Sequence, residues 1–439
     1  MKDRTADPLI DVDKLKVGMY IHLDLGWMSH PFPLSSFKLT SEDQLTVLRR
    51  LGLTQVRWSP GKSELNADAK PMDATFAGAD DAGAGADNAA ADGAKTAEDL
   101  EREAHIAALA AQREALSICE KQYGEAGAAF HKIMQLVPTE PVASRDQSEA
   151  LAAALLDKML IAGDLNIRLL NEAAGDRVTA HALNVSIISL LLGRAFGLSR
   201  DEMMDLGVGS LLHDVGKIEL PPRLRHREDS FSAHETQVYQ SHVAKGVAIA
   251  QGMSLKPGPL LVIAQHHENA DGSGFPQRLN IDRMSTAARI VALVNRFDGL
   301  CNPLQVSRSL TPHEALSLMF AQGRNRFDAT MLNAFIRMMG VYPPGSVVQL
   351  TDDRYALVVA VNSSRPLKPR VMVHDVKVPR EEALILNLEE HPDLGIRRSL
   401  KPQQLPRSSL DYLSPRARVA YFFEPAGHTG TTVAGELAA

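Results

Sequence analysis

The chain of 439 residues has little cysteine, no basic tract and no long apolar run. Its two cysteines, Cys119 and Cys301, lack any paired spacing, so the sequence supports neither a disulfide framework nor a thiolate zinc site, and a reducing compartment fits. A net charge of −6 without a basic tract argues against duplex nucleic-acid binding as the main role. No run reaches the roughly 18 to 20 apolar residues that a spanning helix needs. Residues 1–8 also lack the apolar core of a signal peptide. We therefore expect a cytoplasmic protein without a membrane span.

Residues 9–60 have the pattern of a small α+β domain. Strand patterns cover 17–23 and 54–58, and residues 27–37 read as a loop because prolines interrupt them. A short helix with leucines on one face begins at a capping box that opens with Ser41. These elements predict a small domain that precedes the main body of the chain.

Composition divides the rest of the chain into five segments. Residues 61–96, rich in Ala, Gly and Asp, cannot bury enough surface to offset their ordering entropy and predict a flexible linker. Residues 97–137 predict a helical connector, and residues 140–340 are nearly all helical in pattern. Residues 341–423, rich in Val, predict a small β region, and residues 424–439 a disordered tail. Within the helical region we expect helices at 146–171, 181–196, 206–212, 234–250, 260–265, 286–300, 312–320 and 329–339.

His213 and Asp214 are the central pair of the helical region. They follow an apolar run that a second capping box opens at Ser199, so we expect the end of a helix to present them. An adjacent imidazole and carboxylate can reach two neighbouring cations, with one carboxylate oxygen for each. Taken alone, such a pair is more often a solvated helix end. The residues that favour a metal site lie downstream: His242, His266, His267, Glu268, and the loop Asp271, Gly272, Ser273, Gly274, Phe275 and Pro276.

This ordered set resembles the signature of the HD-GYP family of bacterial phosphodiesterases. The signature has a His, a His-Asp pair followed by Gly-Lys, another His, a His-His-Glu and an Asp-Gly-Ser-Gly-Tyr-Pro loop. The matching residues here begin at His181 and include Gly216 and Lys217, and the likeness covers roughly residues 140–340. The resemblance implies a mainly α fold, an HD-type helical bundle, with the α+β domain before it and the β region after it. Residues 9–60 resemble the small domain that often precedes such modules, and a structural or dimerising role is favoured over a ligand sensor.

The resemblance also implies a chemistry: two divalent transition-metal ions, with iron or manganese favoured and nickel or zinc as alternatives. One ion would be held by His181, His213 and Asp214, and the other by His242, His266 and His267, with Asp214 bridging. Lys217 would contact the scissile phosphate, and Glu268 would make a structural contact. The substrate implied is cyclic di-GMP, opened to linear pGpG and then to GMP. The loop at residues 271–276 would lie at the mouth of the site and bind a partner such as a GGDEF-type diguanylate cyclase. A homodimer stays open.

The sequence departs from the family pattern at several positions. Asn295 stands where the family has a ligating Asp, and Asp298, one turn later, is the residue that could compensate. Arg177 replaces a Glu that recruits a third ion in some members, so we expect none here. Where the family supplies a basic run that holds the dinucleotide, only Arg308 is basic. Phe275 keeps the ring of the motif's Tyr but lacks its hydroxyl.

These departures leave three hypotheses open. The chain is an active phosphodiesterase with a modified nucleotide pocket, a degenerate module that binds nucleotide or a cyclase without turnover, or a phosphohydrolase for another nucleotide. Six predicted ligands and Lys217 are present, and buried imidazoles are costly to keep without a function. We therefore favour the enzyme.

Overall fold

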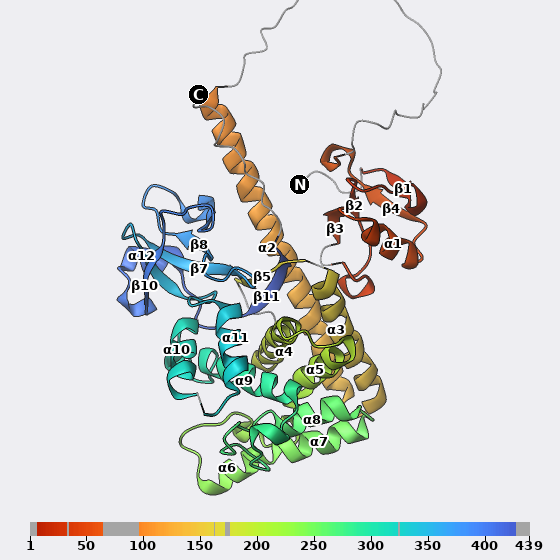
Figure 1. The fold of residues 1–439 in the computed structure, drawn as a ribbon, viewed down its shortest axis with the longest axis vertical. Helices are drawn as coiled ribbons and strands as arrows, with labels where there is room; N and C mark the ends of the chain where they lie inside the picture. The colour runs from red at the N-terminus through yellow and green to blue at the C-terminus, as the bar shows by residue number, and fades with distance from the viewer. Residues whose placement is uncertain are drawn as a thin grey trace, which may run out of the picture. The chain divides into compact units, whose positions relative to one another are not determined.

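The computed structural model describes residues 7–32, 35–64, 96–161, 163–171, 176–323 and 325–426 (Figure 1). The chain divides into two units, with most residues up to 108 in the first and residues 109–439 in the second. Most of the predicted linker at 61–96 and of the predicted tail at 424–439 lies outside the described residues. Each unit is described separately below.

The first unit contains a four-stranded antiparallel sheet and one helix. The strands, in the spatial order β1-β4-β2-β3, are β1 (Leu9–Asp11), β2 (Tyr20–His22), β3 (Ser36–Lys38) and β4 (Gln55–Trp58). Helix α1 (Glu42–Arg50) begins at Ser41, whose side chain accepts a hydrogen bond from the Gln44 amide, and it buries Leu45 and Leu48. The α+β class of this unit is confirmed. The expected loop at 27–37 was wrong at its end, because β3 begins at Ser36.

The second unit is built around helix α4 (Arg177–Ala195), which packs against α3, α5, α9 and strand β11 (Figure 1). Nearly every residue of α4 from Ala182 to Gly193 is buried, as in the core helix of a bundle. By length and composition α4 could cross a membrane, but most of its residues are buried inside this unit. The helices are α2 (Ala97–Leu136, of which residues from 109 belong here), α3 (Pro141–Ile161), α5 (Arg200–Leu212), α6 (Ala233–Gln240), α7 (His242–Gly252), α8 (Pro257–Gln265), α9 (Thr286–Cys301), α10 (Pro312–Gln322), α11 (Ala329–Met339) and α12 (Arg407–Leu413).

A seven-stranded antiparallel sheet joins the C-terminal region to the helical bundle. Its central path is β10-β6-β7-β5-β11, and β8 and β9 extend it from β7. The strands are β5 (Leu165–Leu169), β6 (Val347–Leu350), β7 (Tyr355–Asn362), β8 (Arg370–Val373), β9 (Ile385–Asn387), β10 (Ile396–Leu400) and β11 (Tyr421–Pro425). Strand β5 comes from the middle of the chain and lies between β7 and β11. The C-terminal β region therefore shares its sheet with a strand that precedes the core helix.

Three expectations for this unit were wrong in detail. The helix expected at 146–171 ends at Ile161, and its last residues form β5, whose alternating sequence Leu-Asn-Ile-Arg-Leu is typical of a strand and is buried on both faces. The helix expected at 234–250 is two helices, α6 and α7, which meet at Ser241. The tail expected from residue 424 begins later, since Glu424 and Pro425 belong to β11, where Glu424 forms a buried ion pair with Arg168 of β5 at 3.1 Å.

Candidate metal centre and its cavity

The His213-Asp214 pair lies at the end of α5, as the capping box predicts. The Ser199 and Glu202 side chains complete both hydrogen bonds of that box, and the helix ends at Leu212 with His213 as its C-cap. His213 is completely buried, and its Nδ1 contacts the Ser210 carbonyl oxygen at 2.7 Å. Asp214 then begins a short 3-10 segment, η5 (Val215–Glu219), which packs against α7. The helix end thus carries both side chains into the interior of the bundle.

Four imidazoles approach the two carboxylate oxygens of Asp214 in two pairs. On the Oδ2 side, the Nε2 atoms of His181 and His213 lie 3.6 and 3.5 Å from the oxygen and 3.2 Å from each other. On the Oδ1 side, the Nε2 atoms of His242 and His266 lie 3.5 and 3.7 Å from the oxygen and 3.3 Å from each other. His267 belongs to the second group, and the ligand atoms in each group all lie within 4.8 Å of one another. The carboxylate of Asp214 is shared between the two groups.

The opposite nitrogen of each of these four imidazoles has an acceptor beside it. For His213, His242 and His266 the acceptor of Nδ1–H is the carbonyl oxygen three residues earlier, at 2.7, 2.5 and 2.8 Å. For His181 it is the Asp298 carboxylate, at 2.6 Å. A proton held on Nδ1 leaves a lone pair on each Nε2, the atom that faces Asp214. The short contacts between Nε2 atoms are then not hydrogen bonds, because neither nitrogen carries a proton.

This arrangement fits one cation between each pair of imidazoles. Two nitrogens bound to one ion at about 2.0–2.1 Å, with an angle of about 90–110° between them, lie about 2.9–3.4 Å apart. The two Nε2–Nε2 contacts, at 3.2 and 3.3 Å, fall in this range. Two buried atoms of the centre, Asp214 Oδ1 and His267 Nε2, also have no hydrogen-bond partner among the described residues. The donor set of imidazoles and one shared carboxylate suits borderline divalent metals.

Burial and charge keep these groups in the protonation states that a cation requires. Burial lowers the pKa of His213 and His267 well below the ordinary value, and it lowers the pKa of His242 to about 3. Burial alone would raise the pKa of Asp214, but the charge of Lys217 and the contacts with the nearby histidines hold it well below the usual range. The carboxylate is therefore ionised and these three imidazoles are neutral at pH 7, as metal ligands must be.

Asp298 supports the centre from behind His181. Its side chain is almost fully buried, and besides His181 it accepts hydrogen bonds from the side-chain amides of Asn184 and Asn302, both at 2.8 Å. Both amides also donate to the Val419 carbonyl, at 2.9 and 3.0 Å. Asp298 thus orients His181, and its second acceptor position is filled by amide donors. Asn295 lies one turn earlier on α9 and lines the cavity in front of the centre. These contacts give Asp298 an orienting role toward His181, which speaks against the alternative that it compensates for the missing carboxylate as a ligand.

Sequence reasoning missed Asn184 and Asn302. Asn184 is a fully buried amide within the apolar helix α4. A buried polar side chain is almost always hydrogen-bonded, so its position in the sequence indicates a polar partner in the core. Asn302 follows the last residue of α9, and its backbone NH bonds the Asp298 carbonyl at 2.7 Å. Nothing in the local sequence shows that both amides face one carboxylate.

Lys217 lies beside Asp214 at the edge of the centre. Its Nζ is 2.5 Å from Asp214 Oδ2, and it lies 5.5 Å from the centroid of the Tyr239 ring. The ammonium group therefore borders the metal centre, on the wall of a cavity of about 870 Å³. This volume is within the range of about 300–1,000 Å³ that is usual for small-ligand sites. Asp214, His181, His266 and His267 line the same cavity.

Arg177 and Arg308 both line this cavity but have different surroundings. Arg177 donates through Nη2 to the Asn302 carbonyl at 3.3 Å, and its Nη1 is buried without a partner among the described residues. Arg308, which we expected to contact the nucleotide, pairs instead with Asp229 at 2.6 Å, and half of its side chain is exposed. The cation nearer to the centre is thus Arg177, which stands at the first position of α4.

The loop that follows the double histidine closes against the centre. Glu268 is buried and accepts hydrogen bonds from the Gln277 and Leu279 amides, at 2.7 and 2.9 Å, which confirms the structural contact expected for it. Gly274 has no room for a Cβ atom, which would lie 2.4 Å from the Asn269 nitrogen. The Phe275 ring stacks on His267 with 4.5 Å between centroids. The ring of the motif is thus in contact with a histidine of the centre, even though the hydroxyl is missing.

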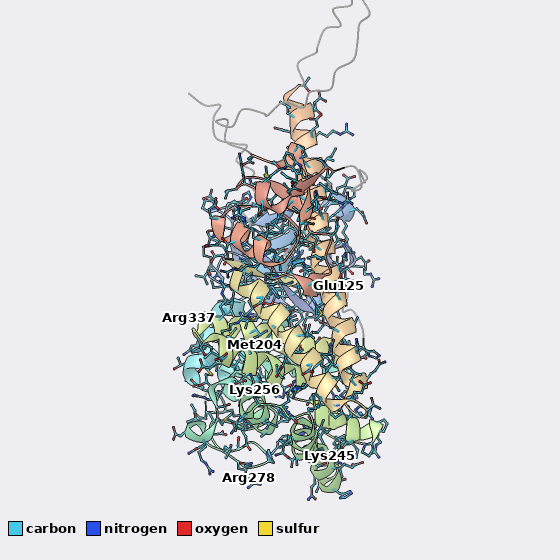
Figure 2. All side chains as sticks on the ribbon, turned by 90° about the vertical axis from the view of Figure 1, so that its right-hand side faces the viewer. Glu125, Met204, Lys245, Lys256, Arg278 and Arg337 are labelled. Carbon is cyan, nitrogen blue, oxygen red and sulfur yellow. The ribbon has the colours of Figure 1, made fainter. Side chains whose placement is uncertain are left out.

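The rest of this loop faces outward. Asp271 is exposed and accepts two hydrogen bonds from Ser273, Gly272 adopts a φ of +76°, and Pro276 is exposed. Figure 2 shows Arg278, just after this loop, and Lys245 of α7 at the same end of the unit. The loop therefore has an inner part, Gly274 and Phe275, and an outer part.

Comparisons with known proteins agree with this geometry. Residues 165–331 match the family model described as HD domain, and residues 9–147 match a domain of unknown function, DUF3391. A cyclic di-GMP phosphodiesterase of Pseudomonas aeruginosa is 25% identical over 370 residues, which cover 83% of this chain and 84% of the relative. A 3'3'-cGAMP-specific phosphodiesterase of Vibrio cholerae is 29% identical, covering 38% of this chain and 32% of the relative. A cyclic di-GMP phosphodiesterase response regulator of Xanthomonas campestris is 30% identical, covering 35% and 41%. This chain therefore spans less than half of the last two relatives.

A solved structure described as an HDGYP protein from Bdellovibrio bacteriovorus aligns with a TM-score of 0.40 and 15% identity, over 75% of this chain and 97% of that one. The helical bundle with a His-Asp centre, together with the family match, defines an HD-domain phosphohydrolase. Within that class, the chain has an HD domain that is similar to those of cyclic di-GMP phosphodiesterases, with Gly-Phe-Pro where the HD-GYP signature has Gly-Tyr-Pro, and it carries the DUF3391 domain before the HD domain.

Proposed function

We propose that this protein hydrolyses cyclic di-GMP to linear pGpG, and on to GMP, at a centre that holds two divalent transition-metal ions. The observation that carries the proposal is the division of four imidazole Nε2 atoms between the two oxygens of one buried carboxylate. The names of the relatives that match this chain support a cyclic dinucleotide as the substrate. Iron or manganese is favoured, and nickel or zinc would also suit imidazole ligands.

The residues divide into two sets of ligands. His181, His213 and Asp214 would hold one ion. The other ion would be held by His242, His266, His267 and the shared Asp214. Bound ions supply a water molecule with a lowered pKa as nucleophile and neutralise charge on the phosphate. The protein's own contribution is to keep the imidazoles neutral and oriented, and to keep Asp214 ionised between them.

Lys217 and Arg177 would stabilise the negative charge that builds on the phosphate in the transition state. Lys217 lies at the edge of the centre. Burial alone would lower its pKa, but the charge of Asp214 outweighs this and leaves the pKa raised, so the ammonium stays protonated. The unpaired Nη1 of Arg177 offers a further donor on the same cavity wall. Preorganised cationic donors of this kind act on charge as it develops, in a site with little water.

Metal analysis combined with a turnover assay tests the proposal. We expect close to two transition-metal ions per chain and hydrolysis of cyclic di-GMP by the wild type. His213→Ala and Asp214→Ala should abolish turnover, and Asp214→Ala should lose both ions. His313→Ala is the matched control, because His313 is a half-buried histidine of α10 that donates to a backbone carbonyl. Protein that binds the nucleotide without metal or turnover would instead establish the degenerate binding module.

Two further expectations stay predictions. One is docking of a GGDEF-type diguanylate cyclase on the loop at residues 271–276, for which the exposed Asp271 and Pro276 offer the available surface. The other is a cytoplasmic location with an optional homodimer. Neither alters the chemistry proposed for the centre.

A further inference from the structure

The cavity in front of the metal centre carries more positive than negative side chains. Seven arginines and lysines line it, against four carboxylates. The positive residues are Arg177, Lys217, Arg225, Arg227, Arg296, Arg308 and Arg326, and the negative ones are Asp214, Glu228, Asp229 and Glu268. A cleft with an excess of one charge concentrates the field and attracts ligands of the opposite charge. Only those cations that have no partner within the protein are free to bind such a ligand.

Four of the seven cations already have partners. Lys217 pairs with Asp214, and Arg308 pairs with Asp229. Arg225 donates to the Leu220 and Ile218 carbonyls, at 3.1 and 3.2 Å. Arg177 donates to the Asn302 carbonyl. These four side chains therefore already have a charged or hydrogen-bonding partner within the protein.

The remaining three, Arg227, Arg296 and Arg326, make no ion pair or side-chain hydrogen bond with any residue that the structure describes. They come from three different segments: the connection before α6, the cavity face of α9, and the connection between α10 and α11. Withdrawal from solvent lowers the pKa of Arg296, and the nearby charges of Arg326 and Arg227 lower it further. Three like charges are thus gathered at one part of the cavity wall. The charge of Arg326 also lowers the pKa of Asp271 on the neighbouring loop, but no carboxylate forms an ion pair with any of the three among the described residues.

Arg296 and Arg326 stand on fixed supports. Residues Ala292, Asn295, Arg296 and Gly299 of α9 all line the cavity, so Arg296 shares the helix face of Asn295. The Arg326 carbonyl accepts a hydrogen bond from the Ala270 amide at 2.8 Å, and its NH donates to the Gly323 carbonyl at 3.0 Å. An ion pair between Arg289 of α9 and Asp328, at 2.8 Å, ties that connection to the helix. The two guanidinium groups are therefore presented from backbone that is held in place.

We propose that Arg296 and Arg326, assisted by Arg227, form an anion subsite that binds the second phosphate group of the substrate while the first lies at the metal centre. A guanidinium group matches a phosphate in charge and in its paired donors, and such hydrogen bonds are among the stronger ones in proteins. The subsite makes the cavity select ligands with two phosphate groups over ligands with one. This inference rests on the proposed function, because it assigns the remaining phosphate of the same substrate.

The test compares a substrate with two phosphodiesters, cyclic di-GMP, with one that has a single phosphodiester, bis(4-nitrophenyl) phosphate. Arg296→Gln and Arg326→Gln should each raise KM for cyclic di-GMP about tenfold to 100-fold, since a charged hydrogen bond contributes about 1.5–3 kcal/mol. Both variants should leave kcat/KM for the single phosphodiester within about twofold of the wild type. Arg308→Gln is the matched control, because that arginine lines the same cavity but is already paired. Equal effects on the two substrates, or none on either, would overturn the subsite.

Further measurements separate a binding role from a folding defect. Arg296→Lys keeps the charge and should recover most of the affinity, and thermal unfolding should show that Arg296→Gln without ligand is as stable as the wild type. The dissociation constant for cyclic di-GMP should rise with salt more steeply in the wild type than in Arg296→Gln. If the wild type hydrolyses neither substrate, the proposed function fails, and the dissociation constants then decide the subsite alone: an unchanged value in Arg296→Gln rejects it.

Discussion

The substitution Asp298→Asn tests whether the carboxylate behind His181 controls the metal centre. In the wild type, Asp298 Oδ2 faces His181 Nδ1, and Oδ1 faces the amides of Asn184 and Asn302. An asparagine has the same size but only one acceptor oxygen. If that oxygen stays with the two amides, the new NH2 group points at His181 Nδ1. The imidazole must then move its proton to Nε2, the nitrogen that faces Asp214.

The expected cost follows from that change of tautomer. A protonated Nε2 cannot bind a cation, so the ion on the Oδ2 side of Asp214 loses one of its ligands. Loss of such an orienting partner typically weakens metal affinity 10–100-fold, or about 1.4–2.7 kcal/mol. The ion on the Oδ1 side depends on His242, His266 and His267, none of which contacts Asp298. We therefore expect one affinity to fall and the other to stay the same.

A competition titration with Mn²⁺ and a chelator measures both affinities. The wild type should bind two ions, and Asp298→Asn should show one step shifted to higher metal concentration by about 10–100-fold. Glu424→Gln is the control, because Glu424 is a buried carboxylate in an ion pair with Arg168, away from the centre. That variant should lose stability without a change in either affinity. If Asp298→Asn keeps both wild-type affinities, or loses both equally, Asp298 does not act through His181.

Three other outcomes are expected. Asn295→Asp adds a carboxylate to the cavity face of α9 and should raise metal affinity in the same titration; no change would mean that the side chain does not reach an ion. Gly216→Ala places a Cβ 1.9 Å from the His242 carbonyl oxygen, so urea unfolding should show a loss of at least about 2 kcal/mol, whereas Gly252→Ala, with open space around it, should lose little. Metal-free protein should lose stability as pH falls from about 6.5, because His242 and His226, with pKa values lowered to about 3 and 4 by burial, stay neutral when folded but take up protons when unfolded. His242 should contribute up to about 1.4 kcal/mol per pH unit, and the more exposed His226 less; a flat profile between pH 7 and 5 would contradict this.

The sequence predicts which residues form the centre because several of them lie at positions with strong local signals. A capping box fixes where α5 begins, and an apolar run fixes where it ends, so the exit of His213 and Asp214 can be read from the chain. The structural role of Glu268 follows from a turn-rich loop beside it. Both predictions depend on residues that lie close together along the chain: Ser199 to Asp214 for the helix end, and Glu268 to Leu279 for the loop.

The parts that the sequence does not predict depend on distant contacts. Asn295 and Asp298 lie three positions apart on α9, and only the rotation of the helix in the bundle decides which of them faces the cavity. Strand β5 was predicted as helix because five alternating residues after a long helical pattern are a short signal, and its partners, β7 and β11, lie far along the chain. No local pattern can show that Asn184 and Asn302 meet at Asp298.

The bonds between these two asparagines and the backbone at Val419 and Tyr421, where β11 begins, set an order for biosynthesis. The Val419 NH donates to Asn302, and the Tyr421 NH donates to Asn184, at 2.9 and 3.0 Å. A nascent polypeptide that has emerged from the ribosome only as far as α11 already contains every predicted ligand, yet it lacks the backbone that holds these amides. Metal loading should therefore follow the synthesis of residues 419–421, and fragments that stop before them should bind the ion beside His181 weakly.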